Sequence, residues 1–258
     1  MVICCANQKG GVGKTTSALN VAICLARRGC PVLAVDCDPQ ATMTRQLGID
    51  ARAVGLTLVD VLAGHAAAGD TLVMDAAPGV DLMAAARELS GVEMALVGEL
   101  GRERFLADAL EPLAERYPTI VLDTPPNLGL LTVNALVSAD IVLAPVSCED
   151  EASMQGLVEL RGTLSKLRRL RDPEPQLLTI LTRWAPARVM SQVIEVSLDE
   201  LGLPVVAKVP SRAAVGQAGA EHVPLAITAP DGCVALAYER LADKLAAAHR
   251  PEPVVISS

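Results

Sequence analysis

The stretch Lys9-Gly10-Gly11-Val12-Gly13-Lys14-Thr15-Thr16 stands between a short apolar run at residues 2–6 and a helical pattern over residues 17–28. A strand, a glycine-rich turn and a helix in this order place several backbone N–H groups at a helix N-terminus. Unpaired donors and the helix dipole stabilise an anion there. The glycines of the turn let the backbone curl closely around a phosphate. The stretch therefore predicts a phosphate-binding loop at the start of an α/β domain.

Two side chains of this loop have the chemistry for a triphosphate with magnesium. Lys14 is predicted to reach the β- and γ-phosphates, and the Thr15 hydroxyl is predicted to bind Mg²⁺. The usual pattern G-x-x-x-x-G-K-[ST] has a glycine where this chain has Gln8, and a second lysine follows at Lys9. Lys9 is either a solvated surface charge or a residue with a role that the standard loop lacks. The residues predicted to contact the nucleotide are Lys9, Gly10, Gly11, Val12, Gly13, Lys14, Thr15 and Thr16.

Apolar runs and helical patterns alternate along the rest of the chain. Strands are predicted at residues 2–6, 31–35, 80–83, 119–123, 141–145, 177–182 and 205–209. Helices are predicted at residues 17–28, 58–62, 91–100, 102–117, 130–138, 152–170, 190–201 and 232–249. Neither a repeat nor a linker interrupts this order, which is typical of a doubly wound α/β fold: a mostly parallel sheet with helices on both faces. We expect a single domain over residues 1–250 and a disordered tail over residues 251–258.

Composition limits the class of protein. A hydrophobic content of 51% over 258 residues is ample for a core, and the 2% of aromatic residues makes that core aliphatic. The chain shows neither a leader pattern nor an apolar stretch approaching the ~18–20 residues of a membrane span, so we expect a cytoplasmic protein. The seven cysteines lack metal-binding spacing and are expected to be reduced and mostly buried. A net charge of −8 excludes a surface that is basic all over, so any contact with nucleic acid requires a local basic patch.

Carboxylates follow two of the predicted buried strands. Asp36 and Asp38 come directly after the strand at residues 31–35, and Asp123 ends the strand at residues 119–123. Open α/β sheets bind ligands at the C-terminal ends of their strands. Phosphoryl transfer needs held phosphates, a bridging Mg²⁺ and an aligned water. We therefore assign Asp123 to the Mg²⁺ site and Asp38 to the orientation of the attacking water.

The loop resembles the deviant Walker A loop of the ParA/MinD family of ATPases. Asp36-Cys37-Asp38-Pro39-Gln40 and Leu122-Asp123-Thr124-Pro125-Pro126 also look like segments of small ParA/Soj proteins, and the similarity extends over about residues 2–230. The resemblance implies that Lys9 crosses a dimer interface to the partner's nucleotide. It also matches Asp38 to the hydrolytic acid of the first switch, and Asp36 to a second acid nearer the metal. For Asp36, hydrogen bonding to the loop backbone remains the alternative role.

The resemblance further implies an ATP-driven cycle. Two monomers holding ATP and Mg²⁺ close into a homodimer, and slow hydrolysis, stimulated by a ParB-like or cargo adaptor protein, separates them. Such proteins segregate or position DNA or a protein cargo, and their dimers bind double-stranded DNA nonspecifically, which makes them nucleoid-associated. Arg183, Arg188 and Arg212 are the candidate DNA contacts in this chain, although Ala214 and Val223 stand where the family has an arginine and a lysine. Adenine contacts are expected near Arg183 and Pro210.

The sequence also bears on four other classes of protein. A Rossmann dehydrogenase would need a third glycine in the loop, and an iron–sulfur ATPase would need a cysteine soon after Asp123, where residues 124–127 are Thr-Pro-Pro-Asn. A MinD-like membrane ATPase would need a basic amphipathic helix near the C-terminus, whereas the predicted last helix carries Glu239 and Asp243. We therefore expect no membrane partner. A nucleotide-gated scaffold that does not hydrolyse ATP is the fourth class, and Asp38 argues against it.

Overall fold

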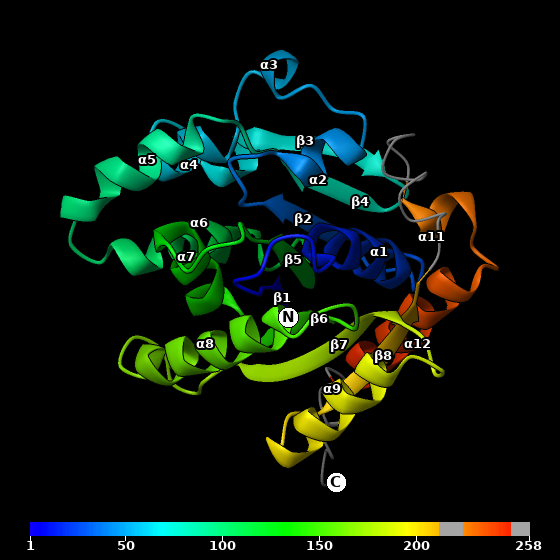
Figure 1. Ribbon diagram of the computed structural model, residues 1–258. Helices are drawn as coiled ribbons and strands as arrows, with labels where there is room; N and C mark the ends of the chain where they lie inside the picture. The colour runs from blue at the N-terminus through cyan, green and yellow to red at the C-terminus, as the bar shows by residue number, and fades with distance from the viewer. Residues whose placement is uncertain (212–223, 249–258) are drawn as a thin grey trace, which may run out of the picture.

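A computed structural model describes residues 1–211 and 224–248 (Figure 1). Its centre is an eight-stranded sheet in the order β3-β4-β2-β5-β1-β6-β7-β8. All neighbouring strands are parallel except β3 and β4, which are antiparallel. The strands are β1 (Val2–Cys5), β2 (Val32–Asp36), β3 (Leu72–Ala77), β4 (Val80–Met83), β5 (Thr119–Asp123), β6 (Ile141–Ser147), β7 (Gln176–Trp184) and β8 (Val205–Pro210). The predicted doubly wound, mostly parallel sheet is confirmed.

Helices cover both faces of this sheet (Figure 1). The α-helices are α1 (Lys14–Ala26), α2 (Thr42–Gln46), α3 (Ala51–Val54), α4 (Leu58–Leu62), α5 (Leu89–Ala95), α6 (Phe105–Leu110), α7 (Leu130–Ser138), α8 (Ala152–Leu167), α9 (Val189–Glu200), α11 (Leu225–Thr228) and α12 (Cys233–Ala248). Short 3₁₀ helices are η1 (Ala68–Thr71), η2 (Leu96–Gly98), η3 (Arg102–Arg104) and η4 (Glu111–Leu113). Within the described ranges, none of the helices has the length and apolarity that crossing a bilayer requires.

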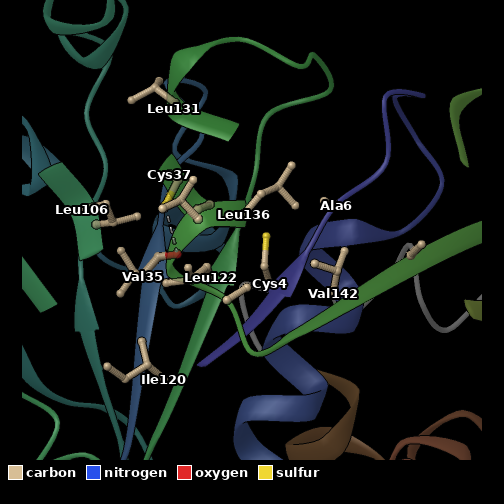
Figure 2. Packing of buried hydrophobic residues seen from close by; sticks show 14 of the residues in the cluster. Cys4, Ala6, Val35, Cys37, Leu106, Ile120, Leu122, Leu131, Leu136 and Val142 are labelled. Carbon is tan, nitrogen blue, oxygen red and sulfur yellow. Dashed lines mark hydrogen bonds between the residues drawn. The ribbon is translucent and has the colours of Figure 1, made fainter. Parts of the chain in front are cut away.

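Two hydrophobic cores lie on the two faces of the sheet, because side chains alternate between the faces along each strand. In β1, Ile3 and Cys5 pack against α1, α11 and α12, whereas Cys4 packs on the opposite face against helices that include α7 and α8. Figure 2 shows this second core, in which Val35 and Leu122 from neighbouring strands lie beside Cys4. Because successive residues of a strand point to opposite faces, an apolar run buried at every position requires helices on both sides. The central strands are therefore fixed in place around the loop that follows β1.

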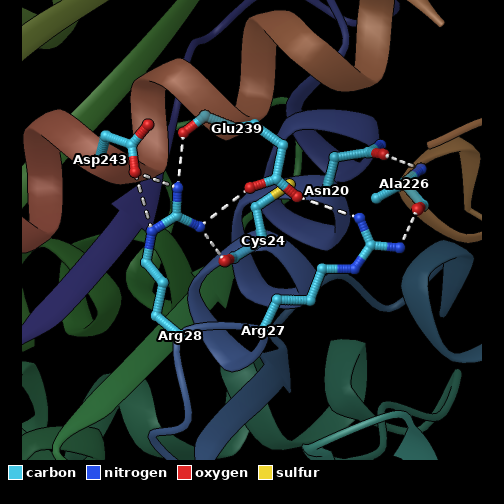
Figure 3. Close-up of polar contacts among 7 residues, drawn as sticks. All are labelled: Asn20, Cys24, Arg27, Arg28, Ala226, Glu239 and Asp243. Atoms are coloured by element: carbon cyan, nitrogen blue, oxygen red, sulfur yellow. Dashed lines mark hydrogen bonds and ion pairs between the residues drawn. The ribbon is translucent and has the colours of Figure 1, made fainter. Parts of the chain in front are cut away.

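Polar contacts fasten the last helices to α1 (Figure 3). Arg28 pairs with Glu239 and Asp243 of α12, and Arg27 pairs with Glu239 and donates to the backbone carbonyl of Ala226 in α11. These ion pairs are partly exposed, so each contributes at most ~1 kcal/mol to the free energy of unfolding. The apolar face of α12 is buried. The ion pairs therefore fix which residues of α12 face the C-terminal end of α1.

Three local predictions were wrong. Helix α1 begins at Lys14 rather than at residue 17, because the last residues of the loop form its first turn. Strand β3 was not predicted, since it is a half-exposed edge strand without a continuous apolar run. The helix predicted over residues 102–117 is divided into η3, α6 and η4, with a proline at the start of η4. The predicted tail lies outside the described residues.

Candidate nucleotide site

The strand register brings the predicted acids next to the loop. Asp36 at the end of β2 is paired with Asp123 at the end of β5, and Asp123 is paired on its other side with Cys5 at the end of β1. The loop leaves β1 at this level and enters α1. Three neighbouring strands therefore deliver the loop and two carboxylates to one edge of the sheet, as predicted.

The loop has the backbone geometry of an anion cradle. Gly11 has φ 75° and Gly13 has φ 92°, both in the left-handed region that favours glycine. Gly13 is the N-cap of α1, and no side chain caps this helix end. The N–H groups of the first turn are therefore available to an anion.

The two lysines of the loop lie in different environments. Lys14 is 7% exposed, and its Nζ donates to the backbone carbonyl of Lys9 at 3.1 Å. Burial lowers the pKa of Lys14, while the carboxylates of Asp123 and Asp38 act in the opposite direction. Lys9 is exposed, and its ammonium makes no hydrogen bond or ion pair within the part of the chain that the structure describes. The Lys14 ammonium therefore lies within the curve of the loop and lines the cavity above it, whereas the Lys9 ammonium is available to a group outside the loop.

Asn7 holds the start of the loop, a role that sequence reasoning did not identify. Its side-chain amide donates to the carbonyls of Pro145 at 2.7 Å and Ser153 at 3.2 Å, and its Oδ1 accepts from the N–H of Lys9 at 3.0 Å. Helix α8 can come this close because residue 156 is a glycine: a Cβ there would lie 2.3 Å from Asn7 Oδ1. The loop is thus bound to β6 and α8 through one buried side chain.

Asp36 is fully buried and all its hydrogen bonds are to its own switch segment. Its Oδ2 accepts from the N–H of Thr44 at 2.9 Å and from the Thr44 hydroxyl at 2.8 Å, and its Oδ1 accepts from the N–H of Asp38 at 3.1 Å. Burial raises the pKa of Asp36 to about 6 despite these bonds. Two of these bonds come from backbone N–H groups of the segment after β2, and none of the three comes from the phosphate-binding loop. Both predicted roles of Asp36, at the metal and at the loop backbone, stay predictions.

Asp123 is the carboxylate that the chain leaves unsatisfied. It is 0% exposed, and neither of its oxygens has a hydrogen-bond partner among residues 1–211 and 224–248. Burial, and then the charge of Asp36, raise the pKa of Asp123 well above its usual value, while Thr15 and Lys14 act in the opposite direction. A buried carboxylate without a partner is costly, and a hard cation with oxygen ligands would relieve that cost. Asp123 and Thr15 therefore fit Mg²⁺.

The chain alone does not build a full metal cage. Within residues 1–211 and 224–248, no group of three His, Cys, Asp or Glu side chains is placed to hold a metal ion. Mg²⁺ commonly takes one or two carboxylates together with waters and the phosphates of a nucleotide. The Asp123 carboxylate and the Thr15 hydroxyl at this edge of the sheet fit such a site, in which waters and phosphates complete the coordination of Mg²⁺.

Asp38 lies at the wall of the site in a tight turn. It is 8% exposed, and its Oδ1 accepts from the N–H of Gln40 at 2.8 Å. Its carbonyl accepts from the N–H of Ala41 at 2.7 Å, and Ala41 has φ 50°. The position of the Asp38 carboxylate therefore depends on the conformation of this turn.

A cavity of about 610 Å³ lies over the loop. Its wall includes the loop from Gly10 to Thr16, Asp38, and both Arg183 and Pro210, where adenine contacts were expected. Val234 and Tyr238 of α12 also line it, and the Tyr238 hydroxyl lies 2.9 Å from Ser17 Oγ. Sequence reasoning missed both residues, because Tyr238 is 221 positions from Ser17 and carries no motif.

Two of the three arginines predicted to contact DNA are engaged by the same carboxylate. Arg183 pairs with Glu149 at 2.6 Å, and Arg188 lies 3.8 Å from the same carboxylate and donates to the carbonyl of Arg183. Arg183 has φ 52°, so its backbone is left-handed at the rim of the cavity. Arg212 lies outside the described residues. One carboxylate thus holds two of the predicted DNA contacts.

Known proteins match this chain over most of its length. A family model described as an AAA domain matches residues 1–177. The sporulation initiation inhibitor protein Soj of Bacillus subtilis is 34% identical over 252 residues, which cover 95% of this chain and 98% of Soj. The chromosome partitioning protein ParA of Caulobacter vibrioides is 39% identical over 196 residues, which cover 75% of this chain and 73% of that protein.

A solved structure shares the fold and carries ligands. The cobyrinic acid a,c-diamide synthase of Mycobacterium smegmatis, with a bound ATP analogue and magnesium, superposes with a TM-score of 0.83 at 31% identity. The match covers 95% of this chain and 93% of that one. Sequence and structure therefore agree on the resemblance that the loop suggested: the chain belongs to the AAA-domain ATPases of the ParA/Soj group.

Proposed function

We propose that this chain is an ATP-hydrolysing, ATP-dependent dimer that segregates or positions a DNA or protein cargo. The observation that carries the proposal is the pairing of an uncapped, glycine-lined helix start with the unsatisfied carboxylate of Asp123. The N–H groups at the start of α1 and the Lys14 ammonium bind and orient the phosphates. Mg²⁺ would supply charge neutralisation on the phosphate oxygens, held by Thr15 and Asp123. Asp38 orients the attacking water from the wall of the cavity.

Dimerisation rests on Lys9. Its ammonium is exposed beside the loop and makes no bond in the described part of the chain, so a second copy facing the cavity receives it without loss of an internal contact. The triphosphate then stabilises the dimer, and its hydrolysis weakens that assembly. A partner protein that changes the position of the Asp38 carboxylate sets the rate of ATP hydrolysis.

Because Glu149 engages Arg183 and Arg188, we propose a second basic surface for DNA binding. Lys208, Arg240 and Lys244, here called the basic patch, line a cavity of about 290 Å³ between β8 and α12, and no acidic side chain lines it. Lys208 is engaged by Glu195, whereas Arg240 has no bonded partner among the described residues. On a chain of net charge −8, this concentration of positive charge supports weak, salt-dependent contact with phosphates.

The basic helix of a MinD-like membrane ATPase finds no support in α12. Its apolar side chains, among them Val234, Tyr238, Leu241 and Leu245, are buried against the body of the protein. Glu239 and Asp243 on its polar side pair with α1. We therefore propose cargo positioning on DNA, without a membrane.

Three measurements on one preparation test the proposal: phosphate release, sedimentation with and without ATP, and mobility shift of double-stranded DNA in low salt. We expect slow phosphate release, a dimer only with ATP, and DNA retardation only with ATP. Lys14→Ala should lose all three, and Asp38→Ala should keep the dimer while losing phosphate release. If wild-type protein forms an ATP dimer but releases no phosphate, the chain is the nucleotide-gated scaffold instead.

A further inference from the structure

Helix α7 begins without a cap of its own. Its N-cap residue is Gly129, and its first turn carries no acidic residue. The first N–H groups of a helix have no partner within it, and an N-cap side chain normally accepts from the second or third of them. Here the acceptor belongs to another helix: Oε1 of Glu93 in α5 accepts from the N–H of Leu131 at 3.2 Å. A carboxylate 38 positions earlier in the chain therefore takes the place of the N-cap side chain.

The glycine at position 129 makes room for this contact. Its φ of −74° and ψ of −175° are open to any residue, so the backbone does not require glycine. A Cβ there would collide with Glu93 Oε1, and it would lie 3.2 Å from Asn127 Oδ1. Gly129 is thus matched to the Glu93 carboxylate, as Gly156 is matched to Asn7.

The middle of α7 is held by contacts that do not involve Glu93. The side-chain amide of Asn134 donates to the carbonyl of Arg102 at 2.8 Å, and its Oδ1 accepts from the N–H of Leu106 at 3.0 Å. These bonds tie the helix to η3 and α6. Loss of the Glu93 carboxylate would therefore loosen the first turn of α7 and the loop before it, and leave the rest of the helix in place.

The loop between β5 and α7 is also fixed independently at its start. The Thr124 hydroxyl donates to the carbonyl of Cys5 at 2.8 Å, and Asp123 before it is paired with Cys5 in the sheet. Asp123, the proposed magnesium ligand, therefore keeps its position when the far end of the loop moves.

The far end of this loop follows the first turn of α7. The Thr132 hydroxyl donates to the carbonyl of Asn127 at 2.7 Å, so this end moves with that turn. Pro126 precedes Asn127 and lines the nucleotide cavity beside Gly10: a Cβ on Gly10 would lie 3.7 Å from Pro126 Cβ. The position of Pro126 in the cavity wall is therefore coupled to the start of α7.

Lys14 indicates which end of the cavity would hold the γ-phosphate. Its ammonium, which is predicted to reach the β- and γ-phosphates, donates to the carbonyl of Lys9, the neighbour of Gly10. Pro126 beside Gly10 therefore lies toward the γ-phosphate end, where an in-line water would approach.

We propose that Glu93 is a positioning residue for ATP hydrolysis: it caps α7 from α5 and thereby holds Pro126 at the γ-phosphate end of the cavity. With the cap in place, the wall confines the attacking water to a position in line with the leaving oxygen. Without it, Pro126 leaves this position part of the time, and the water is aligned less often. The phosphates themselves are bound by the start of α1 and by Lys14. The proposal therefore predicts a change in kcat and not in KM, and it rests on the proposed hydrolysis for that effect.

The test compares Glu93→Ala, Glu93→Gln and Gly129→Ala in steady-state phosphate release. Glutamine keeps an acceptor oxygen, and alanine at position 129 displaces the carboxylate without removing it. We expect kcat to fall about fivefold in Glu93→Ala and in Gly129→Ala, the equivalent of one lost cap, with KM unchanged. Glu93→Gln should keep kcat within about twofold of the wild type. Glu99→Ala, at an exposed position after η2, should match the wild type in both constants.

The double variant Glu93→Ala/Gly129→Ala distinguishes one shared contact from two unrelated defects. If both changes act through the same cap, the double variant should be no slower than Glu93→Ala alone. Amide hydrogen exchange without nucleotide gives a second readout that needs no hydrolysis. Exchange should become faster over residues 124–131 in both single alanine variants, and stay at the wild-type level over residues 134–138.

Several outcomes would overturn the positioning role. They are additive losses of kcat in the double variant, equal kcat in Glu93→Gln and Glu93→Ala, and unchanged exchange over residues 124–131 in Glu93→Ala. A lower free energy of unfolding in Glu93→Ala with wild-type kcat would also overturn it, because Glu93 would then only stabilise α7. If the wild type itself releases no phosphate, the proposed function fails, whereas faster exchange over residues 124–131 in Glu93→Ala would still assign control of this loop to Glu93.

Discussion

Replacing Gly156 by alanine tests whether Asn7 and α8 position the nucleotide loop. In the interior of a helix this change normally stabilises by up to ~1 kcal/mol, because glycine is the poorer helix former. At this position the new Cβ would lie 2.3 Å from Asn7 Oδ1 and 3.1 Å from the N–H nitrogen of Lys9. Ordinary carbon contacts need about 3.5 Å, so the Asn7 side chain has to move.

The cost of that movement follows from the bonds of Asn7. Its side chain makes three hydrogen bonds, to Pro145, Ser153 and Lys9. Losing two of them in a buried environment costs about 2–3 kcal/mol, which exceeds the gain in helix propensity. We expect Gly156→Ala to lower the free energy of unfolding by about 1–2 kcal/mol and to weaken ATP binding by about tenfold, since the loop loses its anchor at Lys9.

The same helix offers a matched control at Gly162. A Cβ there would meet no atom within 4 Å, so Gly162→Ala should stabilise the protein by ~0.5–1 kcal/mol and leave ATP affinity unchanged. Urea denaturation gives the stability of each variant, and calorimetric titration with ATP gives the affinity. Wild-type ATP affinity in Gly156→Ala, or equal stabilisation by the two alanines, would refute the positioning role of Asn7.

The remaining predictions concern charge. Lys9→Ala should still bind ATP but sediment as a monomer, and a normal ATP dimer would contradict a role for Lys9 across an interface. Asp123→Asn should stabilise the nucleotide-free protein, because it removes a buried unsatisfied charge, and should remove the magnesium dependence of ATP binding measured by calorimetry. The folded pKa values of Asp36 and Asp123 lie above their unfolded value of 3.8, so the folded chain binds more protons. Denaturation without nucleotide should therefore show stability falling as pH rises from about 4 through 6, with a smaller fall in Asp123→Asn. Arg240→Glu/Lys244→Glu should abolish the ATP-dependent mobility shift of DNA, and unchanged retardation in low salt would exclude the basic patch.

Much of the site could be predicted because its parts follow buried strands. The apolar runs before Asp36 and Asp123 identify β2 and β5, and parallel strands deliver their C-terminal ends to one edge. The loop at Gly11 and Gly13 is equally local, since its backbone angles depend on glycine at those positions. The local sequence is therefore sufficient to predict a site residue where a single strand or turn fixes the position of that residue.

Contacts between distant segments could not be predicted from the sequence. Nothing near Asn7 indicates that it bonds to β6 and α8, and nothing near Tyr238 indicates that it lines the nucleotide cavity. The sequence around α2 carries no motif, yet Thr44 supplies two hydrogen bonds to Asp36. Arg183 and Arg188 were expected to be free for DNA, but a shared contact with Glu149 determines their position. In each case the role depends on packing between elements far apart in the chain.

The electrostatics of the site link nucleotide binding to the stability of the folded chain. Burial raises the pKa of Asp36 and Asp123 and lowers the pKa of Lys14, so it disfavours the charged form of each of these three groups. A ligand that brings both a cation for Asp123 and phosphates for Lys14 would favour the charged forms of these two groups, and its binding is therefore linked to the stability of the folded state. Asp36 is bonded to α2 through the N–H and the hydroxyl of Thr44, so a change of charge at Asp36 reaches that helix. Because Thr42 and Gln46 of α2 also line the nucleotide cavity, a bound nucleotide would act on the same helix both directly and through the buried acid.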